Sequence, residues 1–255
     1  MIVVPPLYGR GIAVEAANLV VQAYQQYDAF MNGTNWSLQG NYRCLRLLQA
    51  KPGGLLPSVE PFGFVALNQS SNDVFVTFRG TQSLDDWISN LGFPHSTHPW
   101  GQVYQGFDEI YLQCSTDVRG AVGSVTGRRN VIATGHSLGG ALSTLAAADV
   151  KINGIAVGLY NFASPRVGDQ TFATKFNSEV TPAIRVVNSE DIVTTVPLST
   201  TNLSGGTSLG LVLDGLPKAE RSLDYEHVGD AATFTVNKGS IADNHNMKAT
   251  YLTNL

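Results

Sequence analysis

A serine lies between two glycines in the stretch GHSLGG, residues 135–140. The apolar, β-type run at 131–134 precedes it, and an Ala- and Leu-rich segment with helical spacing follows without a break. In a G-x-S-x-G turn from strand to helix, the serine has strained backbone geometry, so Gly135 and Gly139 must lack side chains. The turn exposes the serine oxygen and directs the N-terminus of the next helix at the reaction centre, which makes Ser137 the candidate nucleophile.

A nucleophilic serine needs a base to take its proton, and the base needs an acid to fix its tautomer. In proteins with this turn the chain order is serine, acid, histidine, and only His227 and His245 follow Ser137. His245 lies in the polar segment DNHNMKATYL, where a helix begins, whereas strand-like residues follow His227. We favour His245 as the base and His227 as a structural hydrogen-bonding residue, but the pattern alone leaves both open.

The candidates for the acid are two adjacent carboxylates, Glu190 and Asp191, in the segment VVNSEDIVTTVP. They come just after a predicted strand at 182–188. Catalytic groups gather beyond the carboxyl ends of parallel strands, so either residue fits the role.

The negatively charged intermediate of acyl transfer needs backbone N–H donors, each typically worth about 3–4 kcal/mol in the transition state. Leu138 supplies one as the residue after the nucleophile, and a second comes from an earlier strand-end loop. The strand-like run VFVTF ends in Arg79-Gly80-Thr81, and Gly80 allows the backbone to approach closely. Thr81 is therefore the second candidate donor. The alternative is an ordinary strand-ending turn in which Arg79 makes a structural ion pair.

The elements that position these residues alternate between strands and helices. Helical spacing predicts an amphipathic helix at 11–30, and the turn residues QSSN predict a hairpin between two strands. The predicted strands are 42–50, 62–68, 73–78, 130–134, 154–163 and 182–188, and the later helices are 103–122, 138–150 and 169–178. Such alternation implies a mostly parallel, buried sheet flanked by helices, the α/β class. We expect one domain over residues 1–255.

Composition excludes several classes of function. The 255 residues carry a net charge of -4, and charged residues make up only 14%, so no basic stripe is available to nucleic acid. No stretch approaches the roughly 18 apolar residues of a membrane span. The opening MIVVPPLYGRG has no basic region before its apolar run, so we expect no secretory signal, and the compartment stays undefined.

The two cysteines and the potential metal ligands carry no motif. Cys44 and Cys114 lie outside any C-x-x-C spacing, and we expect two buried free thiols. No metal-ligand spacing is visible either, so we expect neither a metal nor a cofactor.

Ordered motifs extend from Phe78 to Leu252, about two thirds of the chain. They are FRGT (78–81), DDWISNL (85–91), VYQGF (103–107), GHSLGG (135–140), ASPRVGD (163–169), EDIVTTVP (190–197), HVG (227–229) and HNMKATYL (245–252). With these motifs the chain resembles the class 3 lipases, which include the fungal triacylglycerol lipases. Two departures are Tyr104, where the family usually has histidine, and a segment at 198–223 that is longer than expected.

The resemblance implies an α/β-hydrolase fold and assigns a role to each motif residue. It implies Ser137 as nucleophile, Asp191 as acid and His245 as base, and thereby favours Asp191 over Glu190 and His245 over His227. It also implies Thr81 and Leu138 as the oxyanion donors.

A short amphipathic helix is expected directly after the oxyanion loop. Its apolar residues fall at i, i+3, i+4 and i+7, namely Leu84, Trp87, Ile88 and Leu91. Such a face usually packs into a core. Its position and its likeness to the lid of the family favour a helical lid, which covers the active site in water and turns toward an oil or membrane surface.

The sequence therefore predicts a carboxylic ester hydrolase that acts on lipid esters through an acyl-enzyme, with triacylglycerol lipase as the first interpretation. The alternatives within the class are a phospholipase, a galactolipase and a short-chain esterase, including the feruloyl type. The rival from another class is a lipid-binding protein without turnover on the same scaffold. The expected partner is a lipid ester at an oil–water or membrane interface, and the oligomeric state is undefined.

Overall fold

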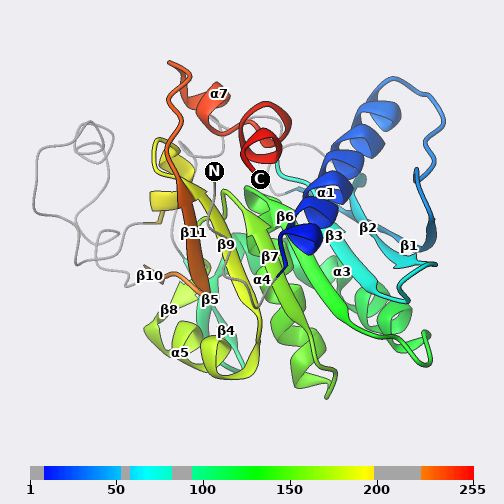
Figure 1. The fold of residues 1–255 in the computed structure, drawn as a ribbon. Helices are drawn as coiled ribbons and strands as arrows, with labels where there is room; N and C mark the ends of the chain where they lie inside the picture. Colours follow the sequence, from blue (N-terminus) through cyan, green and yellow to red (C-terminus); the bar gives the residue numbers. More distant parts are fainter. Residues whose placement is uncertain (1–8, 53–57, 82–93, 198–224) are drawn as a thin grey trace, which may run out of the picture.

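The computed structural model describes residues 9–52, 58–81, 94–197 and 225–255 (Figure 1). Within these ranges a seven-stranded sheet has the order β1-β2-β3-β6-β7-β9-β11. Its strands are β1 (Tyr42–Ala50), β2 (Glu60–Asn68), β3 (Val74–Phe78), β6 (Val131–His136), β7 (Gly158–Phe162), β9 (Ala183–Asn188) and β11 (Asp230–Phe234). Strands β1 to β3 pair antiparallel, and β3, β6, β7, β9 and β11 are parallel neighbours. The mostly parallel sheet is as predicted.

Helices cover both faces of this sheet. On one face lie α1 and the C-terminal segment, and on the other lie α3 and α4 (Figure 1). The helices and helical turns are α1 (Arg10–Met31), α3 (Gln105–Gly123), α4 (Leu138–Ile152), α5 (Gln170–Glu179), η2 (Ile192–Thr195), α7 (Ile241–Asn244), η5 (Met247–Tyr251) and η6 (Leu252–Asn254). None of the described helices is long and apolar enough to cross a membrane.

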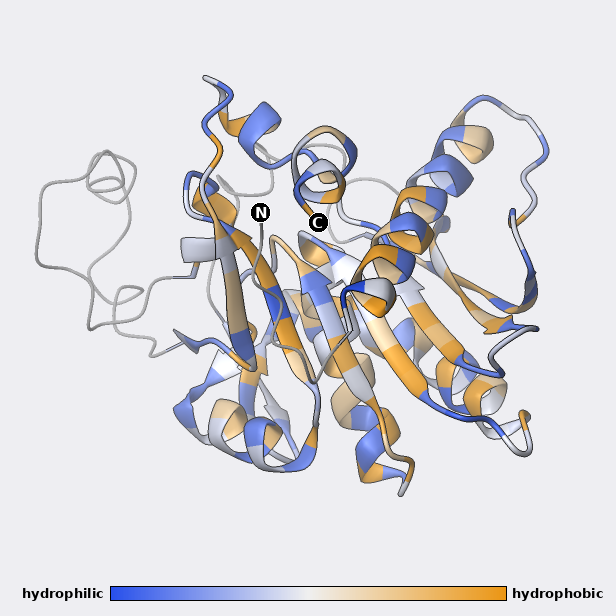
Figure 2. Cartoon of the chain, in the orientation of Figure 1, coloured by the Kyte–Doolittle hydropathy of each residue, from blue (hydrophilic) through white to orange (hydrophobic). Residues whose placement is uncertain are grey.

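Strand β2 shows how the sheet forms two cores. Successive side chains of a strand point to opposite faces. Phe64 and Ala66 accordingly pack in the cluster with α1, whereas Val65 and Leu67 pack in the cluster with α3 and α4. The central strands are therefore buried on both faces, and their apolar composition is visible along the sheet (Figure 2). This burial rigidly supports the loops at the carboxyl ends of the strands.

The predicted strands and helices of the described residues are present, and two of their shifted boundaries have a clear cause. The helix predicted from residue 103 begins at Gln105, because residues 101–104 form strand β5 of a small second sheet. That sheet has the order β10-β8-β5-β4, with β4 (His95–His98), β5 (Gly101–Tyr104), β8 (Gly168–Asp169) and β10 (Tyr225–Glu226). The strand predicted from residue 154 begins at Gly158, because Gly154 has φ 80° in the turn after α4.

The cysteines differ in burial. Both are free thiols, as expected, but only Cys114 is buried. Cys44 is exposed on β1, which is an edge strand of the large sheet. The prediction of burial was wrong for Cys44 because the outward-facing side of an edge strand is not covered by a helix.

Candidate active site

Ser137 lies in the tight turn between β6 and α4. Its backbone has φ 59° and ψ -129°, a strained conformation for a residue with a side chain. Its N–H donates to the Phe162 carbonyl at 3.0 Å, and its carbonyl accepts from the Gly140 N–H at 2.8 Å. The turn is thus held by the sheet on one side and by the first turn of α4 on the other.

Contacts, rather than backbone angles, require the two glycines that flank Ser137. A Cβ on Gly135 would lie 2.0 Å from the Gly139 carbonyl oxygen. A Cβ on Gly139 would lie 2.5 Å from the carbonyl oxygens of Phe78 and Arg79. Both distances are far below van der Waals contact, so neither position has room for a side chain. This agrees with the reason given above for the glycines of the motif.

The predicted acid and base are in contact although they lie far apart in the sequence. Asp191 follows the carboxyl end of β9 and begins η2, where its Oδ1 accepts from the Val193 N–H at 3.0 Å. His245 directly follows α7, and its Nδ1 lies 2.7 Å from Asp191 Oδ2. Asp191 is 1% exposed and His245 is 6% exposed. The pair is therefore buried beside the loops that end the parallel strands.

Tyr251 completes the surroundings of the Asp191 carboxylate. Its hydroxyl donates to Asp191 Oδ2 at 2.6 Å and accepts from the Asn188 N–H at 3.2 Å. Burial and the nearby Asp191 carboxylate raise the pKa of Tyr251 well above its usual value, so it remains a donor. A carboxylate only accepts hydrogen bonds. His245 therefore carries its proton on Nδ1, and Nε2 presents a lone pair suited to a general base.

The structure does not form the hydrogen bond between the predicted nucleophile and the predicted base. Ser137 Oγ and His245 Nε2 are both buried, and neither has a hydrogen-bond partner among the described residues. Ser137 as a whole is only 1% exposed. Catalytic hydrogen bonds are often long or poorly aligned without substrate, so this geometry does not remove His245 as the base. The structure brings the acid and base together, and leaves the reacting atoms of the serine and the base unpaired.

The loop that carries Thr81 lies against Ser137. A Cβ on Gly80 would be 2.7 Å from Ser137 Cβ, so Gly80 allows the close approach. The buried Arg79 forms an ion pair with Glu60 at 2.5 Å and donates through Nη1 to the Gly80 carbonyl at 2.7 Å. The alternative expectation of a structural ion pair at Arg79 is thus confirmed. It is compatible with Thr81 as an oxyanion donor, which stays a prediction.

The remaining predicted residues fall into two groups. His227 donates from Nε2 to the Thr194 carbonyl at 2.8 Å, and Glu190 accepts from Asn237, so neither is in the Asp191–His245 pair. Burial and the guanidinium groups of Arg185 and Arg166 lower the pKa of His227 to about 3. The predicted lid residues lie outside the described residues, namely Leu84, Trp87, Ile88 and Leu91.

Three polar residues near this site had no assigned role in the sequence. Tyr251 lies inside the quoted motif HNMKATYL and His136 inside GHSLGG, so membership of these motifs was an available signal for both residues. Tyr24 lies on α1 and donates to His136 Nδ1 at 2.8 Å. Nothing in the spacing of α1 distinguishes Tyr24 from Tyr27, since both fall within one amphipathic pattern.

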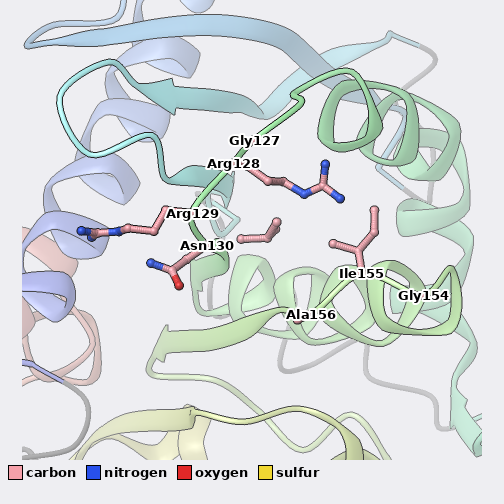
Figure 3. A pocket seen from close by; sticks show the side chains of 8 residues that line it. Gly127, Arg128, Arg129, Asn130, Gly154, Ile155 and Ala156 are labelled. Carbon is pink, nitrogen blue, oxygen red and sulfur yellow. The ribbon is translucent and has the colours of Figure 1, made fainter.

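A separate hollow lies where strands β6 and β7 begin, at the end of the sheet opposite the candidate active site. It has a volume of about 350 Å³ and is lined by Gly127, Arg128, Arg129, Asn130, Val131, Gly154, Ile155 and Ala156 (Figure 3). Arg129 is engaged with Asp73 at 2.7 Å, and Arg128 donates to the Val125 carbonyl at 2.7 Å. The described residues contain no group of three or more metal-ligating side chains, here or elsewhere.

Comparisons with known proteins show that this chain is similar to lipases. Residues 75–201 match the family described as lipase (class 3). The chain is 31% identical over 140 residues to a secreted mono- and diacylglycerol lipase of Fusarium solani, which covers 52% of this chain and 42% of that protein. It is 29% identical over 185 residues to the chloroplastic phospholipase A(1) DAD1 of Arabidopsis thaliana, with 60% of this chain and 41% of that protein covered. The chain thus spans about two fifths of the length of these curated relatives.

A solved structure agrees in the arrangement of the elements. The lipase of Rhizopus microsporus var. chinensis superimposes with a TM-score of 0.61 and 28% identity, over 74% of this chain and 70% of that chain. This similarity and the mostly parallel sheet between helices identify the α/β-hydrolase fold.

Proposed function

Because the chain belongs to the class 3 lipase family, we propose that it is a serine hydrolase that cleaves lipid esters. The observation that carries the proposal is the buried hydrogen bond between Asp191 and His245, beside a serine in a strained strand-to-helix turn. A protein that only bound lipid would not need a buried carboxylate to orient an imidazole whose other nitrogen is unpaired. The geometry thus supports turnover over simple binding.

In the proposed reaction Ser137 Oγ attacks the ester carbonyl while His245 Nε2 takes its proton. Asp191 holds the imidazole in the required tautomer and stabilises the imidazolium that forms. The backbone N–H groups of Leu138 and Thr81 donate hydrogen bonds to the carbonyl oxygen and so stabilise the negative charge that develops on it. His245 then gives this proton to the leaving alcohol, which departs and leaves an acyl-enzyme on Ser137. The same imidazole next takes a proton from a water molecule, which attacks the acyl-enzyme, and it passes that proton to Ser137 Oγ as the fatty acid leaves.

The proposed proton transfer requires a hydrogen bond between Ser137 Oγ and His245 Nε2, which the structure does not form. The Ser137 backbone is held by hydrogen bonds to Phe162 and Gly140, so we propose that the side chain forms this hydrogen bond by rotation about its Cα–Cβ bond when substrate binds. A rigid backbone with one free torsion suits a nucleophile that must form and break a bond in each cycle.

For the substrate we propose a glycerolipid ester, with triacylglycerol first. One relative is named a mono- and diacylglycerol lipase and the other a phospholipase A(1), so acylglycerols and phospholipids are the two substrate groups to separate. The pattern at 81–93 supports a lid and action at an oil–water or membrane interface, although the residues predicted to form its apolar face lie outside the described part of the chain. Interfacial action predicts a jump in rate when a short triglyceride passes its solubility limit.

The test is a substrate profile measured with a matched inactive variant. Hydrolysis of p-nitrophenyl esters of increasing chain length, triacylglycerol emulsions and phosphatidylcholine vesicles is compared between the parent protein and Ser137→Ala. We expect hydrolysis of acylglycerols by the parent and loss of that activity in the variant. Equal rates for parent and variant would reject Ser137 as the nucleophile, and turnover of phosphatidylcholine alone would reassign the substrate.

A further inference from the structure

A chain of hydrogen bonds joins four segments at the active site. The Gly80 N–H lies 3.0 Å from Tyr24 Oη, and Tyr24 Oη lies 2.8 Å from His136 Nδ1. His136 Nε2 lies 2.8 Å from the carbonyl oxygen of His245. The path runs from the loop of the predicted oxyanion donor, through α1 and the residue before the nucleophile, to the backbone of the predicted base.

The direction of every bond in this path is fixed by chemistry. A carbonyl only accepts, so His136 carries its proton on Nε2 and donates it to His245. His136 Nδ1 must then accept, so the Tyr24 hydroxyl donates to it. The Gly80 N–H donates to the remaining lone pair of the Tyr24 oxygen. One arrangement of protons therefore satisfies all four groups.

His136 holds this arrangement because it is neutral. It is 3% exposed, and burial and the neighbouring His245 lower its pKa well below the usual value. Its ring centroid lies 4.5 Å from that of His245, so a charged His136 would repel the imidazolium that forms on the base. A neutral ring in this place keeps the base free to take a proton.

The oxyanion loop is held from both sides. Tyr24 accepts from the Gly80 N–H, and Arg79 donates to the Gly80 carbonyl at 2.7 Å. Because the peptide bond is planar and trans, fixing the Gly80 carbonyl also fixes the direction of the following Thr81 N–H. The Tyr24 hydroxyl thus contributes both to the orientation of this loop and to the orientation of His136.

We propose that Tyr24 and His136 are positioning residues that fix the oxyanion loop and the base relative to Ser137. Neither residue forms a hydrogen bond to Ser137 Oγ or to His245 Nε2, and both act through Gly80 and through the backbone of His245. This inference rests on the proposed function, because it concerns the rate of the step that Ser137 carries out.

Tyr24→Phe is the direct test, because it removes only the hydroxyl at the centre of the path. We expect kcat for a soluble p-nitrophenyl ester to fall by about 10-fold to 100-fold, with KM changed less than about 3-fold, since misplacement alters the transition state more than ground-state binding. His136→Asn is the second variant. It breaks the path one residue later, and we expect a decrease in kcat at least as large.

Tyr42→Phe is the matched control for a purely structural effect. The Tyr42 hydroxyl donates to Glu15 at 2.7 Å and so also joins α1 to the sheet, outside this path. We expect Tyr42→Phe to lower the melting temperature about as much as Tyr24→Phe while kcat stays unchanged. If both tyrosine variants lower kcat equally, or if Tyr24→Phe leaves kcat unchanged in folded protein, the positioning role is wrong.

The same measurements separate this inference from the proposed function. A folded parent protein without Ser137-dependent ester hydrolysis would reject the function itself. An active parent with an equally active Tyr24→Phe would reject only the positioning role.

Discussion

The parallel strands of the central sheet end at the carboxyl edge, which holds the candidate active site, and begin at the opposite edge, which holds the hollow. Both edges contain turns with glycines, yet they differ in what surrounds these glycines. At the carboxyl edge, a Cβ on Gly135 or Gly139 would collide with backbone atoms at 2.0 Å and 2.5 Å. At the opposite edge, Gly127 and Gly154 have φ 67° and 80°, and a Cβ on either would meet no heavy atom within 4 Å. The first pair is required by contact and the second pair by backbone conformation.

The polar groups differ in the same way. At the carboxyl edge, Ser137 Oγ and His245 Nε2 are buried without a partner among the described residues. At the opposite edge, the hollow is lined by cations that already have partners, since Arg129 binds Asp73 and Arg128 donates to the carbonyls of Val122 and Val125. Unpaired buried polar atoms with a strained backbone therefore mark the reacting site better than a hollow does.

The largest expected effect concerns the acid at the carboxyl edge. Asp191→Asn keeps the shape of the side chain but favours the wrong His245 tautomer, so we expect kcat to fall by about 10⁴-fold. Glu190→Gln is the matched control, since the neighbouring carboxylate contacts Asn237 and not His245. Initial rates on p-nitrophenyl butyrate measure both variants, and a greater loss in Glu190→Gln would exchange the two assignments.

The glycines provide the second test of the comparison. Gly139→Ala places a Cβ against the Phe78 and Arg79 carbonyls, and we expect a loss of at least about 3 kcal/mol in the free energy of unfolding. Gly127→Ala meets no atom, so only its left-handed backbone conformation opposes it, at about 1 kcal/mol. Urea denaturation gives both values. Similar losses at the two positions would remove the distinction between contact and conformation.

The third test uses pH, because two histidines, His136 beside the nucleophile and His227 before β11, have a lowered pKa. Burial and two nearby arginines lower the pKa of His227 to about 3, and burial and His245 lower the pKa of His136 well below its usual value. In the unfolded chain both rings bind a proton near pH 6.5, so below that pH the unfolded state binds more protons than the folded state.

The stability that these neutral rings provide is therefore fully present above about pH 6.5 and is lost as the pH falls below it, for His227 down to about pH 3. For each histidine we expect the free energy of unfolding to fall by about 1.4 kcal/mol per pH unit in that window. Urea denaturation between pH 5 and pH 7 should show a smaller dependence on pH for His227→Gln than for the parent. An unchanged slope would mean that His227 is not a source of the effect.

The smallest effect is expected at the hollow of the opposite edge. Arg128→Ala removes the bond to the Val125 carbonyl, and we expect a loss of about 1 kcal/mol in stability with unchanged kcat and KM. Melting temperature and ester hydrolysis are measured on the same preparation. A clear loss of activity in Arg128→Ala would show that this hollow takes part in function and would contradict the comparison.

The sequence predicted the carboxyl edge well because local rules determine it. The alternation of elements indicated the sheet, and the glycine spacing around Ser137 indicated the turn, since both depend on neighbouring residues. Physical reasoning alone left Glu190 against Asp191 open, because adjacent residues on a loop differ only in the direction that the folded backbone gives their side chains. The motif resemblance favoured Asp191, and the contact between Asp191 and His245 is consistent with that choice.

Long-range contacts set the limit of the prediction. Tyr24 lies 112 positions from His136, and no pattern within α1 indicates that this tyrosine reaches the site while Tyr27 packs over Arg79. The start of β7 was misplaced for a local reason, since an apolar run does not show where a left-handed glycine ends the preceding turn.

The most direct test of the central claim is covalent labelling of the nucleophile. The folded protein is treated with an alkyl phosphonate ester that reacts with activated serines, and the labelled residue is located by mass spectrometry in the tryptic fragment 130–151. We predict one adduct, on Ser137, which forms in parallel with the loss of ester hydrolysis and does not form in Asp191→Asn at a comparable rate. An adduct on another residue, or complete inactivation with Ser137 unlabelled, would contradict the account.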